Sequence, residues 1–215
     1  MAATQFLWRH PALVKAWIFI LCLAPLGLLV WDGFHDLLGA NPIEKIMRRT
    51  GDWVLYFLLI TLAVTPLRNA FGWRRLLQYR RMLGLFTFFY VVLHFLNYLV
   101  LDQFFAWDEI VKDIIKRPYI TVGFSAFVLL IPLAATSTNR MMKRLGKNWK
   151  KLHSLIYLIG VLAIVHYLWL VKADNREPLI YAAILVVLLL LRTRWVTRML
   201  NNRSGQVIQQ AVTRE

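Results

Sequence analysis

The stretch Lys150 to Tyr167, KKLHSLIYLIGVLAIVHY, decides how this sequence folds. It is an apolar run with His153 at its entry, His166 deep inside it and no charged residue between them. A run of this kind is expected to cross a membrane as a helix, and an ionisable residue within a spanning helix is a functional candidate because burial in lipid is costly. Histidine is the least costly of these residues, since it can remain neutral and offer a nitrogen lone pair to a metal.

The composition agrees with a membrane protein. Of the 215 residues, 59% are hydrophobic, and the mean hydropathy of +0.54 lies well above the range of soluble domains. We expect one transmembrane domain over 1–215, because the apolar runs leave little room for a soluble domain. Cys22 is the single cysteine, which excludes an intrachain disulfide and an iron–sulfur cluster bound within this chain.

The apolar runs predict an all-α, polytopic helical bundle of about six spans. A hydrocarbon core needs about 20 helical residues. The second and sixth runs are short for this length, so each could instead be a re-entrant segment. The first run has no small-residue cleavage site and is expected to be a retained span rather than a signal peptide. The six runs are 12–30, 53–67, 82–101, 119–136, 152–171 and 178–191.

Charge alternates between successive linkers. The leader, the second and fourth linkers and the tail together carry 18 basic residues and one acid, whereas the other linkers carry 8 basic residues and 10 acids. Basic residues favour the cytoplasmic side of a membrane, so this asymmetry predicts that both termini are cytoplasmic. The same asymmetry accounts for the net charge of +15 without a nucleic-acid partner.

Two histidines are predicted to lie at matching depth in the bundle. His94 lies 13 residues beyond Arg81, and His166 lies 15 residues beyond Lys151. With a rise of about 1.5 Å per residue, the two side chains lie roughly 20 and 22 Å from the cytoplasmic boundary, on helices that run the same way. Two buried imidazoles at one level are what the iron of a six-coordinate heme requires. The alternative is that each histidine only bridges helices through a hydrogen bond.

His153 is expected to play a different role. It lies near the cytoplasmic end of its run, about 20 Å along the helix from His166. The equivalent depth on the third run is near Arg81, which cannot serve as an axial ligand. His153 could therefore ligate a second heme with an unusual partner, contact a heme propionate, or help to bind another cofactor.

Other function classes fit the sequence less well. It has no glycine-rich nucleotide loop, nucleophile elbow or zinc-ligand spacing, so catalysis of the kind seen in soluble enzymes is not predicted. A proton-coupled transporter would require acids inside the spans, and we predict that Asp and Glu are confined to linkers and tail. A cofactor-free assembly protein would leave the matched histidines unexplained.

Several motifs resemble the heme-binding membrane subunits of periplasmic methionine-sulfoxide reductase systems, the MsrQ family. These motifs span about residues 10 to 195. The wider resemblance is to ferric-reductase-like transmembrane domains, which usually carry a second histidine on the third span, absent here. The motifs are TGDW at 50–53, TLAVTPLR at 61–68, RRMLGL at 80–85 leading to His94, RPYI at 117–120, WKKLH at 149–153 and HYLW at 166–169.

The resemblance implies a multi-pass protein of the bacterial inner membrane that binds heme b and FMN. It implies that electrons come from quinol and pass to a periplasmic, molybdopterin-containing methionine-sulfoxide reductase, so the chain would be an electron-transfer subunit and not the catalytic one. The heme-ligand role carries onto His94 and His166, and less directly onto His153. The FMN site cannot be placed on named residues.

Overall fold

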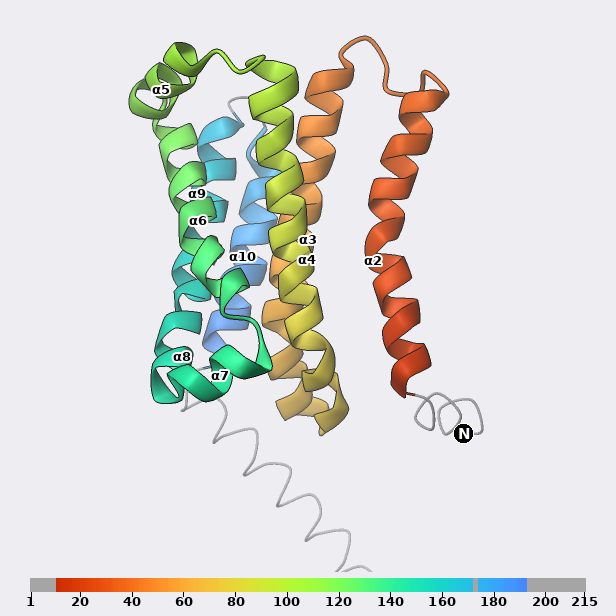
Figure 1. The fold of residues 1–215 in the computed structure, drawn as a ribbon, viewed down its shortest axis with the longest axis vertical. Helices are drawn as coiled ribbons and strands as arrows, with labels where there is room; N and C mark the ends of the chain where they lie inside the picture. The colour runs from red at the N-terminus through yellow and green to blue at the C-terminus, as the bar shows by residue number, and fades with distance from the viewer. Residues whose placement is uncertain (1–10, 172–173, 193–215) are drawn as a thin grey trace, which may run out of the picture.

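The computed structural model describes residues 11–171 and 174–192, and within them the chain is helical, without strands (Figure 1). The long helices run up and down beside one another, and shorter ones lie at the two ends of the bundle. In chain order the helices are α2 (Pro11–Phe34), α3 (Pro42–Phe71), the 3₁₀ turn η1 (Arg74–Leu76), α4 (Leu77–Leu96), the π-helical turn η2 (Asn97–Asp102), α5 (Trp107–Lys116), α6 (Pro118–Ala135), α7 (Asn139–Leu145), α8 (Lys147–His153), α9 (Leu155–Leu170) and α10 (Arg176–Leu190).

This architecture confirms the predicted polytopic helical bundle. Among the described residues, five helical segments are long and apolar enough to cross a membrane: Pro11–Phe34, Pro42–Phe71, Leu77–Asp102, Pro118–Ala135 and Lys147–Leu170. The sixth predicted span, 178–191, corresponds to α10. The 15 residues of α10 are shorter than the roughly 20 that a hydrocarbon core requires.

The second span differs most from its prediction. We expected a short helix over 53–67, whereas α3 has 30 residues and begins at Pro42. Its start is fixed locally, because the Asn41 side chain accepts a hydrogen bond from the Glu44 amide and a proline occupies the first helical position. The early turns carry charged residues, so hydropathy alone misses them. Asp52 therefore lies within α3, and the expectation that acids are confined to linkers is wrong at this position.

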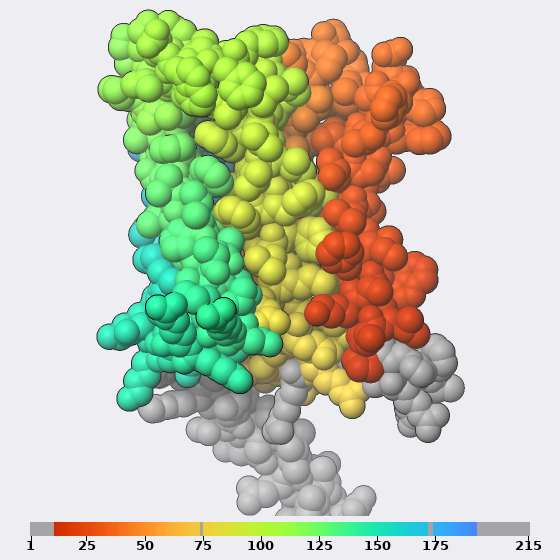
Figure 2. All heavy atoms as spheres, viewed as in Figure 1, coloured from red at the N-terminus to blue at the C-terminus, as the bar shows by residue number. Residues whose placement is uncertain are grey.

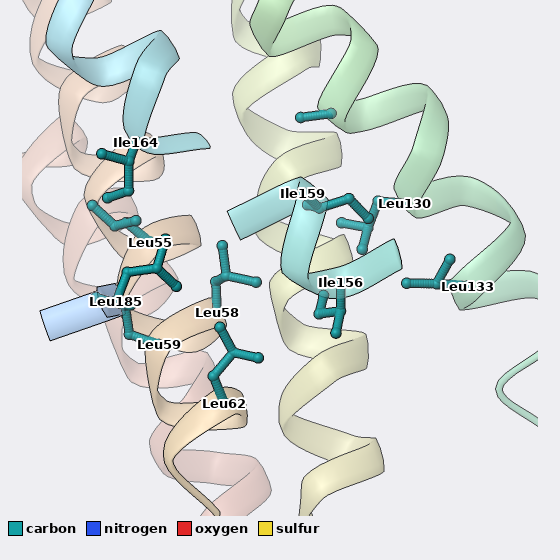
Figure 3. Close-up of a cluster of buried hydrophobic side chains, with 11 residues drawn as sticks. Leu55, Leu58, Leu59, Leu62, Leu130, Leu133, Ile156, Ile159, Ile164 and Leu185 are labelled. Carbon is teal, nitrogen blue, oxygen red and sulfur yellow. The ribbon is translucent and has the colours of Figure 1, made fainter. Parts of the chain in front are cut away.

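The core lies where α3, α6, α9 and α10 meet (Figure 3). Leu62 of α3 is fully buried, and Leu130 of α6, Ile159 of α9 and Leu185 of α10 are almost so. The closest helix pairs are α3 with α4 and α6 with α9. Burial of these side chains thus joins two helix pairs into one body.

The first helix, α2, stands to one side of the bundle and meets α3 and α4 (Figures 1 and 2). Its contact is centred on Tyr90, whose hydroxyl donates to the Cys22 carbonyl (2.9 Å) and accepts from the Leu26 amide (3.2 Å). Pro25 lies between these two residues and lacks an amide hydrogen. Tyr90 therefore inserts into the backbone ladder of α2 at the point where proline weakens it.

The bundle has two ends of different charge. The mixed-charge end holds the α2–α3 connection, α5 and the start of α10, and the basic end holds the α3–α4 connection, α7 and α8 (Figure 1). The helices α4 and α9 both run from the basic end to the mixed-charge end, as the alternation of spans predicted. The fifth predicted span, 152–171, is divided near Ser154 into α8 and α9.

Candidate functional site

The structure brings His94 and His166 together. His94 lies in the last turn of α4, and His166 lies near the end of α9. Their ring centroids are 6.4 Å apart, and the ring planes are nearly perpendicular, at 85°. Both side chains are half-buried near the mixed-charge end of the bundle. The predicted match in depth therefore corresponds to a direct juxtaposition of the two rings.

A backbone carbonyl orients each ring. Nδ1 of His94 donates to the Met47 carbonyl of α3 (3.1 Å) and lies 3.2 Å from the Thr50 hydroxyl, and Nδ1 of His166 donates to the Tyr119 carbonyl of α6 (2.7 Å). A hydrogen bond from Nδ1 fixes the neutral tautomer whose lone pair is on Nε2. Metal-ligating histidines are commonly held by this kind of partner.

A glycine beside each carbonyl makes room for the ring. A Cβ atom on Gly51 would lie 3.2 Å from Cε1 of His94, and a Cβ atom on Gly123 would lie 2.7 Å from Nδ1 of His166. Each glycine follows the bonded carbonyl by four residues, so the two share a helix face. Both imidazoles thus lie over a bare stretch of helix backbone, one on α3 and one on α6.

This arrangement fits two axial ligands of one iron. Two imidazoles that share a metal have ring centroids roughly 6 Å apart, since each metal–nitrogen bond is about 2 Å long. The observed spacing agrees with this distance, and the Nδ1 hydrogen bonds leave Nε2 for the metal. Within the described residues, no group of three or more His, Cys, Asp or Glu side chains could hold a metal ion.

The chain is also distorted directly after His94. The helix α4 continues into the π-helical turn Asn97–Asp102, and the side-chain amide of the buried Asn97 donates to the Ile43 carbonyl at the start of α3 (3.3 Å). Such turns are often found at functional sites. This contact ties the end of α4 to the same helix that positions His94.

The aromatic residues near His94 in the sequence separate into two groups. Phe86 and Tyr90 face α3, where both stack with Phe57. Phe88 and Phe95 face α6 and stack with Phe127, the latter at 4.9 Å between centroids. Phe86 and Tyr90 therefore belong to the contact between α4 and α3, whereas Phe88 and Phe95 belong to the contact with α6.

His153 lies apart from the other two histidines, at the end of α8 at the basic end of the bundle. Its ring stacks on Trp149 at 3.8 Å, Nδ1 donates to the Trp149 carbonyl (3.2 Å), and Nε2 lies 3.4 Å from the Ser137 hydroxyl. Both ring nitrogens therefore have a polar neighbour within the chain. The structure therefore separates His153 from the His94–His166 pair, and its role stays a prediction.

Sequence reasoning missed several polar groups around the histidine pair. In the sequence Thr50 and Gly51 stand out only as part of a motif, although both contact His94. At the same end of the bundle, Tyr167 donates to Glu177 (2.9 Å) and Tyr181 donates to Tyr56 (3.2 Å). The adjacency of Tyr167 to His166 in sequence was the available signal for the first of these pairs.

The chain resembles known proteins over most of its length. The family described as ferric reductase like transmembrane component matches residues 50–164. A relative from Herminiimonas arsenicoxydans is 56% identical over 86% of this chain and 89% of its own length. Relatives from Xanthomonas euvesicatoria pv. vesicatoria (54% identical, 81% of this chain and 83% of theirs) and Caulobacter vibrioides (48%, 90% and 92%) are similar. All three are named protein-methionine-sulfoxide reductase heme-binding subunit MsrQ.

No solved structure matches the chain. The matched family region contains His94 and His153, whereas His166 lies two residues beyond its end. The relatives cover a larger part of the chain than this region does, at about half identity. Together with the bundle of membrane-spanning helices, these similarities show that the chain belongs to the MsrQ family of ferric-reductase-like membrane proteins.

Proposed function

We propose that this protein is a membrane electron-transfer subunit in which His94 and His166 are the axial ligands of a b-type heme. The observation that carries the proposal is the pair of neighbouring imidazoles, whose ring centroids are 6.4 Å apart and each of which is held through Nδ1 by a backbone carbonyl. Helix bridging alone accounts for the two Nδ1 hydrogen bonds, but it gives no reason for the two rings to lie next to each other at one level of the bundle.

The residues of the chain hold the site rigid. Met47 and Tyr119 keep the rings in the tautomer that presents Nε2, and Gly51 and Gly123 fix the faces on which the rings lie. A heme bound there would supply one-electron redox chemistry. The half-buried position between apolar helices limits access of water and so helps to set the potential of a bound group.

The electron path follows from the family and from the charge asymmetry. We infer that the basic end faces the cytoplasm of a bacterial inner membrane, which places the histidine pair towards the periplasm. Electrons would come from quinol, with FMN as a second bound cofactor, and would leave to a periplasmic, molybdopterin-containing methionine-sulfoxide reductase. The names of the relatives support the reductase partner and the heme. Quinol and FMN rest on the family resemblance alone.

The test is the heme content of purified variants. His94→Ala and His166→Ala should each abolish heme binding or reduce it severely, because a porphyrin at this level loses one of its two axial bonds. His153→Ala should retain a low-spin heme spectrum, since His153 lies at the opposite end of the bundle. The measurement is the heme-to-protein ratio together with the reduced-minus-oxidised spectrum.

His35→Ala is the matched control. His35 also bonds a backbone carbonyl through Nδ1, that of Trp31 at 2.9 Å, but it lies after α2 and outside the histidine pair. It should leave heme content unchanged, which separates a ligand effect from a general effect of losing an imidazole. Full heme occupancy in His94→Ala, with loss of heme in His153→Ala, would contradict the proposed pairing.

A further inference from the structure

Three arginines at the basic end differ from the other basic side chains that the structure describes there. Arg68, Arg80 and Arg192 are half-buried, although they come from α3, α4 and the turn that follows α10. The remaining basic residues of this end whose side chains the structure describes are exposed: Lys15, Arg75, Arg81, Arg140, Lys143, Arg144, Lys147, Lys150 and Lys151. Positive-inside topology accounts for the exposed set, but it gives no reason to bury guanidinium groups.

Arg192 is held in place on two sides. Nη2 donates to the carbonyl of the fully buried Leu62 (2.7 Å), and Nη1 donates to the Tyr157 hydroxyl (2.6 Å). Its guanidinium carbon lies 5.2 Å from the centroid of the Tyr157 ring. The Nε atom is buried without a hydrogen-bond partner among the described residues. A charged donor group with one orphaned N–H is thus fixed between α3 and α9.

The positive charges of Arg192 and Arg68 lie close enough to Arg80 to repel its guanidinium group. The charge of Arg80 also interacts with His153. Arginine does not lose its proton in proteins, so this mutual repulsion cannot be relieved by deprotonation. Arg68 donates to the neutral amide oxygen of Asn69, which does not neutralise a charge. The three side chains therefore concentrate positive charge in a partly desolvated place.

No carboxylate near these arginines neutralises them within the part of the chain that the structure describes. The four ion pairs formed there all lie at the mixed-charge end: Arg48–Glu44, Lys112–Glu109, Arg117–Asp113 and Arg176–Asp174. Ten of the eleven acidic residues of the sequence belong to that end, and the eleventh, Glu215, lies outside the described residues. Desolvated like charges without a counter-ion are costly, which indicates that the counter-ion is a bound ligand.

We propose that Arg68, Arg80 and Arg192 form an oxyanion site that receives the phosphate or carboxylate group of a bound redox cofactor. Guanidinium groups match the planar geometry of such anions and form charge-assisted hydrogen bonds with them. The inference rests on the proposed function, because it takes the ligand to be FMN, through its phosphate, or a heme, through a propionate. It places that cofactor at the basic end, beside His153 and away from the His94–His166 pair.

The test compares FMN with riboflavin, which lacks the phosphate. The full-length protein is placed in phosphatidylcholine nanodiscs, and the affinity for each flavin and the heme-to-protein ratio are measured. In the unmutated protein FMN should bind more tightly than riboflavin. In Arg192→Gln and Arg80→Gln this preference should fall roughly tenfold or more, since a charge-assisted hydrogen bond is lost. Arg144→Gln, which removes an exposed charge at the same end, should leave the preference unchanged.

A second measurement avoids the risk that a variant fails to fold. In the unmutated protein FMN, but not riboflavin, should slow the modification of Arg80 and Arg192 by phenylglyoxal, as followed by mass spectrometry. If heme content and not the flavin preference falls in the variants, the oxyanion is a propionate and the proposal still holds.

Unchanged flavin preference and unchanged heme content in the arginine variants would overturn the proposed oxyanion site. A difference between the variants and the unmutated protein that is seen only when anionic phosphatidylglycerol replaces phosphatidylcholine would overturn it as well. The low-spin spectrum assigned to His94 and His166 is recorded in parallel. Its loss in the histidine variants tests the proposed function separately, because none of the three arginines contacts that pair.

Discussion

Gly123 and Gly51 show how single residues set the position of each imidazole. Within α3 and α6 the glycine lies one turn beyond a carbonyl that already accepts a helical hydrogen bond, and a carbonyl oxygen has a second lone pair. Because glycine has no side chain, a histidine can reach that second lone pair over the bare backbone. The contact is tighter at Gly123 than at Gly51.

Gly123→Ala should therefore impair heme binding without removing a ligand. The added Cβ would lie 2.7 Å from Nδ1 of His166, so the ring must shift away from the Tyr119 carbonyl. Loss of such a supporting contact typically lowers metal affinity by about 10- to 100-fold. Heme titration of purified protein measures this change.

Gly84→Ala is the matched control, because its Cβ would meet Thr61 at an ordinary contact distance of 3.7 Å. It replaces a glycine of a spanning helix in the same way, but far from either histidine ring. Equal heme affinity in Gly123→Ala and Gly84→Ala would show that the space left by Gly123 does not position His166.

Only part of the arrangement around the two histidines can be predicted from the sequence. His94 and His166 could be paired, because depth along a helix follows directly from residue number. The Met47 and Tyr119 carbonyls could not be identified as partners of the histidines, since every residue has a carbonyl. Only the packing of α3 on α4 and of α6 on α9 selects these two. For the same reason, Arg192 could not be distinguished from the exposed basic residues before its contact with Leu62 was known.

At the scale of the helices, the attachment of α2 to the bundle is centred on the side chain of Tyr90. Tyr90 is almost completely buried and supplies both hydrogen bonds that replace the backbone ladder around Pro25. Cys22, one turn before Leu26, is 4% exposed behind this contact and is the only cysteine of the chain. It is therefore a native reporter of whether α2 remains attached.

Tyr90→Phe should loosen α2 by about 1 kcal/mol, in line with the modest value of hydrogen bonds between membrane helices. Maleimide labelling of Cys22 in detergent should become roughly fivefold faster as a result. Tyr98→Phe removes a tyrosine hydroxyl of the π-helical turn Asn97–Asp102, one that donates to Asp113 of α5 and not to α2, so it should not change the labelling rate. Unaltered labelling in Tyr90→Phe would mean that apolar contacts alone hold α2.

The extent of α3 shows where hydropathy fails at the element scale. The charged turns that contain Glu44, Arg48 and Asp52 are helical because of local capping by Asn41 and the contacts of α3 with its neighbours. An average over apolar residues ends the helix where the charges begin. The opposite holds for 152–171, where a continuous apolar pattern conceals the break at Ser154 between α8 and α9.

For the whole molecule, the charge asymmetry predicts the orientation in the membrane. Reporter fusions after Asn69 and Asn148 should report the cytoplasm, whereas fusions after Asn41, Asp108 and Asn175 should report the outer side. The physical reason is the accumulation of arginine and lysine at one end of the bundle. The fusion after Asn202 should also report the cytoplasm, although that position lies outside the described residues. An inverted pattern would place the histidine pair on the cytoplasmic side.

The two halves of the bundle repeat one arrangement. The bonded carbonyl, the glycine and the histidine occur at Met47, Gly51 and His94, and again 72 residues later at Tyr119, Gly123 and His166. The helix pairs α3–α4 and α6–α9 carry these residues and run in the same directions (Figure 1). Each pair therefore supplies one half of the site.

This division has a consequence for biosynthesis. A ribosome adds about 5 to 20 residues per second, so His94 exists for roughly 4 to 14 s before His166 is made. During that interval α3 and α4 can already orient one imidazole, but a cofactor would have a single ligand and would be weakly held. Stable loading has to wait until α9 is inserted and packed against α6. Heme acquisition is thus expected to be a late step, and to report that both halves of the chain have reached the membrane.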